Sequence, residues 1–144
     1  MHGGVFEELV CCEVAAWNNA DRAFGEAGLP LSCARFLPLR ALADGPMCVR
    51  ELAQRINAAQ STASRPMKRM AEDGLIARAS AEGDHRCVEL SLAEKGKSLF
   101  NRALPVFEEC TARQFGMLSA AELEAFRAAL ERISAATCEG GVSA

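Results

Sequence analysis

The hydrophobic positions of the first 43 residues follow a helical period. Apolar side chains recur every three or four residues over Val5–Ala27, and this spacing predicts a first helix. The sequence Gly28-Leu29-Pro30 ends it, with the glycine as C-cap and the proline as a stop. A second helix is expected over 32–43, with Ser32 as its N-cap. Pro38 should remove one backbone hydrogen bond from this helix and bend it.

Two short helices are predicted next. Residues 49–56 carry apolar side chains at positions i, i+3, i+4 and i+7, and a second helical pattern covers 61–73 before Gly74. Two helices joined by a tight turn form a helix-turn-helix, whose second helix can enter a DNA major groove. Pro66 conflicts with the second pattern because it cannot bond to the carbonyl of Thr62. We therefore expect either a late helix start near Ser64 or a distorted first turn.

After Gly74 the period changes from 3.6 to 2. Residues 75–80 and 87–92 read as two short strands that bracket the polar segment 81–86, which predicts a β-hairpin. A helix-turn-helix followed by such a hairpin is a winged helix.

The rest of the chain is helical again. We expect a long helix from Ala93 to about Gly116, bent at Pro105, and a last helix to about Ala136 that opens with a Ser119–Glu122 capping box. The predicted fold class is mainly α with a small β-hairpin wing, a winged helix-turn-helix flanked by N- and C-terminal dimerisation helices. Residues 1–144 are expected to form a single domain, with a DNA-binding lobe at 32–92 and helical dimerisation regions at 1–31 and 93–138. The flanking apolar stripes suit a second subunit, and two-fold pairing is the commonest assembly.

The composition excludes some classes of protein, and the charge distribution points to a partner. The chain has 144 residues, of which 50% are hydrophobic, so it can bury a core and is not a disordered chain. Its net charge of −3 argues against a nucleic-acid binder. Residues 48–69, however, carry five basic side chains against one acidic one. A basic stretch in an acidic chain predicts a polyanionic partner.

The sequence also predicts a cytoplasmic protein with no membrane partner. There is no apolar run of spanning length, and the N-terminus has acidic residues where a signal peptide has basic ones. Seven cysteines, an odd number without a Cys-x-x-Cys motif, are expected to be reduced thiols, and two histidines offer little for a metal site. We expect no cofactor. A glycine-rich phosphate loop and a catalytic partner for either histidine are also absent from the sequence, so an enzyme is not expected.

Several motifs occur in the order found in one family. They are Leu39-x-x-Leu42, Val49-x-x-Leu52-Ala53, Ser61-Thr62-Ala63-Ser64-Arg65, Asp73-Gly74-Leu75-Ile76-x-Arg78, Asp84-His85-Arg86 and Leu92-x-x-x-Gly96. With this set the chain resembles the MarR family of bacterial transcriptional regulators over about Leu31 to Ile133. The resemblance implies a homodimer with two winged helices that binds a palindromic double-stranded DNA operator. It also implies repression relieved by a small phenolic or lipophilic effector, or by oxidation.

The candidate base-reading residues lie in the second short helix. Ser61, Thr62 and Ser64 can bond phosphates or base edges, and Arg65 can bond guanine O6 and N7 together. The alternative is that Ser61 only caps the helix and Arg65 is solvated. Lys68 and Arg69, one turn further on, are better placed for phosphates.

The hairpin supplies a second set of candidates. The resemblance implies that Arg86, placed at the hairpin tip, enters a minor groove, where a narrow A·T-rich groove attracts arginine. Asp84 would orient Arg86 or a neighbouring arginine, or the two would only tie the turn. Arg78 would either brace the hairpin or touch a phosphate.

Two cysteines are redox candidates. Cys48 occupies the capping-box position before Glu51, two residues from Arg50, and a thiol at a helix N-terminus can have a lowered pKa. Cys87 lies beside Arg86; the alternative for both is an ordinary small residue. Some members of the resembled family sense peroxide through a first-helix cysteine aided by tyrosines. This chain has no Tyr, and its first-helix pair Cys11 and Cys12 stands among glutamates, so we interpret that pair as structural.

An effector pocket is expected between the first helix and the DNA-binding lobe. Trp17 would line it with Phe36 and Arg40 opposite, and the arginine would suit a carboxylate or phenolate. The alternative for Trp17 is core or dimer packing. A competing function of another class is a winged-helix protein-interaction module, which would not need the basic residues of the second short helix.

Overall fold

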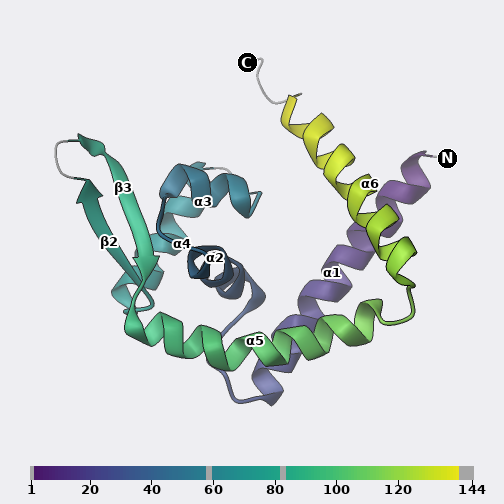
Figure 1. Cartoon of the computed structure of the whole chain (residues 1–144), viewed down its shortest axis with the longest axis horizontal. Helices are drawn as coiled ribbons and strands as arrows, with labels where there is room; N and C mark the ends of the chain where they lie inside the picture. The colour runs from purple at the N-terminus through teal and green to yellow at the C-terminus, as the bar shows by residue number, and fades with distance from the viewer. Residues whose placement is uncertain (1, 58–59, 82–83, 140–144) are drawn as a thin grey trace. The chain divides into compact units, whose positions relative to one another are not determined.

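The architecture is a helical chain with one small antiparallel sheet (Figure 1). A computed structural model describes residues 2–57, 60–81 and 84–139, without the side chains of 60–64, 81, 84–87 and 137–139. The elements in chain order are α1 His2–Glu26, α2 Cys33–Ala43, β1 Met47–Cys48, α3 Val49–Arg55, α4 Gln60–Glu72, β2 Ile76–Ala81, β3 Asp84–Leu92, α5 Glu94–Phe115 and α6 Ala120–Glu139. The predicted fold class, mainly α with a hairpin wing, is confirmed. Within these ranges, no helix has the length and apolar character needed to cross a membrane.

The chain divides into two compact units, residues 1–110 and 111–144, with the boundary inside α5. The first unit holds α1, the helix-turn-helix formed by α3 and α4, and the sheet. The second unit holds the end of α5 and all of α6.

The sheet has the strand order β1-β3-β2, with β3 in the centre. Met47 of β1 and Arg78 of β2 are both register partners of Leu90, which is fully buried. Strand β1, which has only two residues, was not predicted from the sequence. The hairpin strands are longer than predicted, because β2 extends to Ala81 and β3 already begins at Asp84. Asp84 and Arg86 therefore lie in strand β3 rather than in a six-residue turn.

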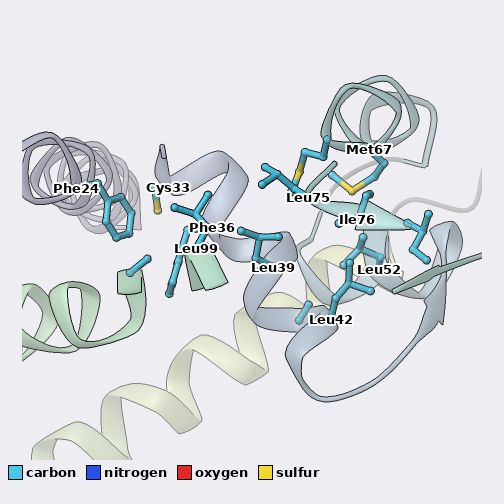
Figure 2. Packing of buried hydrophobic residues seen from close by; sticks show 14 of the residues in the cluster. Phe24, Cys33, Phe36, Leu39, Leu42, Leu52, Met67, Leu75, Ile76 and Leu99 are labelled. Atoms are coloured by element: carbon cyan, nitrogen blue, oxygen red, sulfur yellow. The ribbon is translucent and has the colours of Figure 1, made fainter. Parts of the chain in front are cut away.

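The core of the first unit is built around Phe36 on α2. Its ring centroid lies 5.3 Å from that of Phe24 on α1, and 5.8 and 4.5 Å from those of Phe100 and Phe107 on α5. Figure 2 shows Phe24, Cys33 and Phe36 grouped with Leu99. Aromatic pairs at these separations add to the stabilisation that comes from burying their apolar area. This cluster packs α1 and α5 against α2, the helix that leads into the helix-turn-helix.

The helix ends follow the sequence in part. The Ser119–Glu122 capping box is confirmed: the backbone N–H of Ser119 donates to Glu122 Oε2 at 2.8 Å, and that of Glu122 donates to Ser119 Oγ at 3.3 Å. Ser32 is the N-cap residue of α2, but its side chain makes no capping bond. Instead, the backbone N–H of Cys33 donates to Asp21 Oδ1 on α1 at 2.6 Å. A residue distant in sequence thus satisfies the first free backbone N–H of α2.

Pro66 lies inside α4. The helix begins at Gln60, so the late start near Ser64 is not observed. Met67 and Met70 follow the proline as two buried side chains. Packing of this methionine face offsets the backbone hydrogen bond that proline removes.

Candidate nucleic-acid interface

Helix α4 has one buried face and one basic exposed face. Met67 and Met70 point into the core, whereas Arg65, Lys68 and Arg69 are exposed. Among the described residues, none of these three cations forms a salt bridge. Since α4 is the second helix of the helix-turn-helix, its free cations lie on the face that could meet a polyanion.

Several predicted contact residues lie outside the described side chains. The backbones of Ser61, Thr62 and Ser64 lie in the first turns of α4, and those of Asp84, Arg86 and Cys87 lie in β3. Arg78 is described, and it is exposed on β2 opposite Leu90. The predicted residues of the helix and of the hairpin therefore come from the same unit of the chain.

Helix α3 begins at a reciprocal cap. Cys48 Sγ accepts the backbone N–H of Glu51 at 3.5 Å, and Glu51 Oε2 accepts the backbone N–H of Cys48 at 2.8 Å. The second bond is the main cause that lowers the pKa of Glu51, with the Cys48 side chain and the Arg50 charge acting in the same direction. The capping position predicted for Cys48 is thus the observed one, and its side chain is half-buried.

The connection from α3 to α4 begins with a left-handed residue. Asn57 has φ 53°, and it is the one described non-glycine residue with positive φ. Asparagine tolerates this region better than other side chains do, so it can end α3 and turn the chain. Just before it, Arg55 pairs with Asp44 of the turn that follows α2. The ion pair links the end of α3 to the end of α2.

A hollow of about 680 Å³ lies beside this connection. It is lined by Leu37, Arg40, Ala41, Ala43, Asp44, Arg55, Ile56, Asn57, Phe100, Leu104 and Glu108. Arg40 is exposed, and its guanidinium carbon lies 5.8 Å from the ring centroid of Phe107, within cation–π range. The hollow therefore combines apolar walls from α2 and α5 with two cations, Arg40 and Arg55, and two carboxylates, Asp44 and Glu108. Of these cations, Arg40 is held against an aromatic ring.

The structure does not bring together the three residues that were predicted to line an effector pocket. Phe36 is fully buried at the centre of the aromatic cluster. Trp17 is 36% exposed and lines a different, smaller hollow on α1, of about 270 Å³, with Glu13, Val14 and Asn18. Of the three predicted residues, Arg40 alone lines the larger hollow. The sequence missed Arg55, Asn57 and the α5 residues because nothing in their local pattern marks them as neighbours of α2.

The described cysteines differ in environment. Cys11 and Cys12 are exposed on α1, so neither belongs to the core of the chain. Cys33 is buried, and burial raises the pKa of its thiol to about 11, with smaller contributions from the Asp21 carboxylate and from Cys110. Cys33 is therefore a protonated core thiol at neutral pH.

Two helices expose large apolar side chains. On α1 these are Val5, Phe6, Val10, Val14 and Trp17, with Phe6 67% exposed. In the second unit, Met117, Leu123, Phe126 and Ile133 are exposed, the last three on α6. Contiguous exposed apolar faces are typical of protein contact surfaces.

Comparison with known proteins gives a family match over part of the chain, and structures that share its fold. Residues 27–86, which include α2, α3, α4 and β2, match the MarR family. Among curated proteins, none matches the chain. The Mycobacterium tuberculosis transcriptional regulator MosR, solved in complex with DNA, is 21% identical, with 94% of this chain and 97% of that chain covered and a TM-score of 0.82.

Two further structures share the fold. A cysteine-to-serine mutant of MarR from E. coli, complexed with operator DNA, is 14% identical, covers 90% of this chain and 93% of its own, and has a TM-score of 0.79. BpsR of Bordetella bronchiseptica, described with the regulation of its DNA binding by 6-hydroxynicotinic acid, is 24% identical, covers 90% and 92%, and has a TM-score of 0.80. The predicted resemblance is confirmed by the family match, and the winged-helix fold by all three structures.

Proposed function

We propose that this chain, a MarR-family protein through its residues 27–86, is a sequence-specific DNA-binding transcriptional regulator that represses from a palindromic operator. The observation that carries the proposal is the exposed face of α4, where Arg65, Lys68 and Arg69 stand free of ion pairs among the described residues. Arg65 reads a base edge, while Lys68 and Arg69 bind phosphates. Such a protein acts on genomic DNA in the bacterial cytoplasm.

The DNA-binding form is a homodimer. The exposed apolar side chains of α1 and of α6 are the surfaces that a second copy would cover. A two-fold dimer presents two copies of α4, which matches the symmetry of a palindromic site.

The effector binds in the hollow beside the α3–α4 connection. Its apolar walls and Arg40 suit a small aromatic or lipophilic acid whose carboxylate or phenolate pairs with the guanidinium. The BpsR relative supports this class, because 6-hydroxynicotinic acid is an aromatic hydroxy acid. A ligand there would touch Asn57 and Arg55, so it could shift α4 relative to α2 and weaken DNA binding.

Recovery of bound genomic fragments with the purified protein tests the DNA proposal. Fragments should share a palindromic sequence, and Arg65→Ala should weaken binding to that sequence more than to random duplex. Lys68→Ala should weaken both equally and lower the salt slope of binding by about one. A wild-type slope that corresponds to about one phosphate contact or fewer would instead favour the protein-interaction module.

A thiol-sensing regulator is the second candidate, and the cap on α3 favours it. Oxidation of Cys48 by a hydroperoxide to a sulfenic acid would change the group that accepts the Glu51 N–H at the start of the helix-turn-helix. Operator binding should then fall on peroxide treatment in the wild type and persist in Cys48→Ser. Equal loss in both proteins would exclude Cys48 as the sensor. Cys87 is the alternative thiol, and the matched variant is Cys87→Ser.

A further inference from the structure

A third hollow, of about 550 Å³, lies between α2 and α4 and shares no lining residue with the hollow of about 680 Å³ proposed for the effector. It is lined by Arg35, Arg65, Pro66, Arg69, Met70, Glu72 and Asp73. Arg65 and Arg69 are one helical turn apart on α4, and Arg35 comes from the first turn of α2. Three guanidinium groups from two helices thus line one concave surface.

Two carboxylates belong to the same surface. Asp73 pairs with Arg35, and its backbone carbonyl accepts from Lys95 Nζ at 2.8 Å. Arg35 is held by this ion pair while its side chain keeps 34% of its surface exposed. With Glu72 also counted, the lining carries three positive and two negative charges, a net charge of +1. This charge complements a single phosphodiester.

We propose that Arg35 and Arg69 bind one phosphate of the DNA backbone at this hollow while Arg65 reads a base edge, and that Arg35 of α2 is a DNA-contacting residue that Asp73 positions. The proposal rests on the proposed DNA-binding function. When α4 lies in the major groove, the groove wall beside it is a row of phosphates. The planar guanidinium of arginine matches phosphate oxygens in pairs, and an ion-paired arginine loses less freedom on binding.

The salt dependence of DNA binding tests this proposal. In Arg35→Gln the slope of log affinity against log salt should fall by about 0.9, and affinity for operator and for random duplex should fall by the same factor. Arg35→Lys keeps the charge, so its slope should stay near that of the wild type. Arg102→Gln removes an exposed charge from α5, outside all three hollows, and should bind as the wild type does.

The possible results distinguish the role of Arg35 from the DNA-binding function proposed for the whole protein. If the wild type binds DNA and Arg35→Gln has the same salt slope and affinity, the role of Arg35 is overturned. The proposed DNA-binding function would then be unaffected. A wild type without duplex binding overturns both. Calorimetry with inorganic phosphate tests whether the hollow is instead a site for free phosphate. Phosphate binding that Arg35→Gln abolishes, together with an unchanged salt slope for DNA, would overturn the assignment to DNA. Since an exposed ion pair contributes little to stability, Arg35→Gln should fold, which thermal melting checks.

Discussion

Cys48 and Glu51 cap each other at the start of the helix-turn-helix. The Cys48 thiol accepts the Glu51 backbone N–H at 3.5 Å, and the Glu51 carboxylate accepts the Cys48 backbone N–H at 2.8 Å. A sulfur atom is a weaker acceptor than a hydroxyl oxygen, so the chain uses a less effective cap where serine is usual. The same two bonds place a thiol at the first helix of the DNA-binding module.

The cap predicts how substitutions of Cys48 change the stability of the protein. Cys48→Ala should lower the free energy of unfolding by about 1 kcal/mol, because the N–H of Glu51 loses its acceptor. Cys48→Ser should equal or exceed the wild type. Urea denaturation of the three proteins measures the difference, and equal stability of the alanine and serine variants would contradict a capping role.

Gly96 should tolerate no side chain. A Cβ built there would lie 1.9 Å from the carbonyl oxygen of Leu75, which also accepts the backbone N–H of Ala93 at 3.1 Å. Gly96→Ala must separate α5 from the start of the hairpin, with a cost on the order of 2–4 kcal/mol. Thermal unfolding measures it. Gly25→Ala, where nothing lies within 4 Å, is the matched control on α1 and should be stable.

Cys33 should make stability fall at alkaline pH. Burial raises the pKa of its thiol to about 11 in the folded chain, whereas an unfolded cysteine ionises near about 8.5. Its contribution is fully present below the unfolded pKa and is lost as pH rises through the folded pKa. Unfolding free energies of wild type and Cys33→Ala, measured from pH 7 to 11, should converge at high pH. A constant difference would show that the thiol titrates alike in both states.

The proposed dimer should depend on the apolar faces of α1 and α6. Phe6→Glu and Phe126→Glu each place a charge on a face that the dimer would bury, and each should shift the protein toward monomer. Light scattering after size-exclusion chromatography measures the mass. Glu7→Gln, a change at an exposed position next to Phe6, is the control. A monomeric wild type would contradict the dimer directly.

The proposed effector site predicts that a substitution of Arg40 impairs ligand-induced release from the operator but not operator binding. Arg40→Gln should leave operator affinity near that of the wild type, because Arg40 lies outside the proposed DNA surface, and should weaken release by an aromatic acid such as 6-hydroxynicotinic acid about tenfold or more. Titration of operator complexes with the acid measures release. Equal release in both proteins would place the effector elsewhere.

The candidate site was predictable where its residues are local in sequence. Arg65, Lys68 and Arg69 stand within one helical pattern, and the Cys48-x-x-Glu51 spacing predicted its own cap. Arg35 was not predictable, because its partner Asp73 lies 38 residues away. The same is true of the hollow proposed for the effector, which α2 and α5 line together although they are far apart in the sequence.

By itself the sequence determined the helix order, the hairpin, two capping boxes and the basic α4, since all of these depend on side chains a few residues apart. Only the tertiary structure decided that β1 pairs with β3, that Asp21 of α1 accepts the first backbone N–H of α2, and that Phe36 is core while Arg40 faces a hollow. Such choices depend on how much apolar surface each packing buries and on which polar groups it leaves to be paired. Both are properties of segments that meet only after folding.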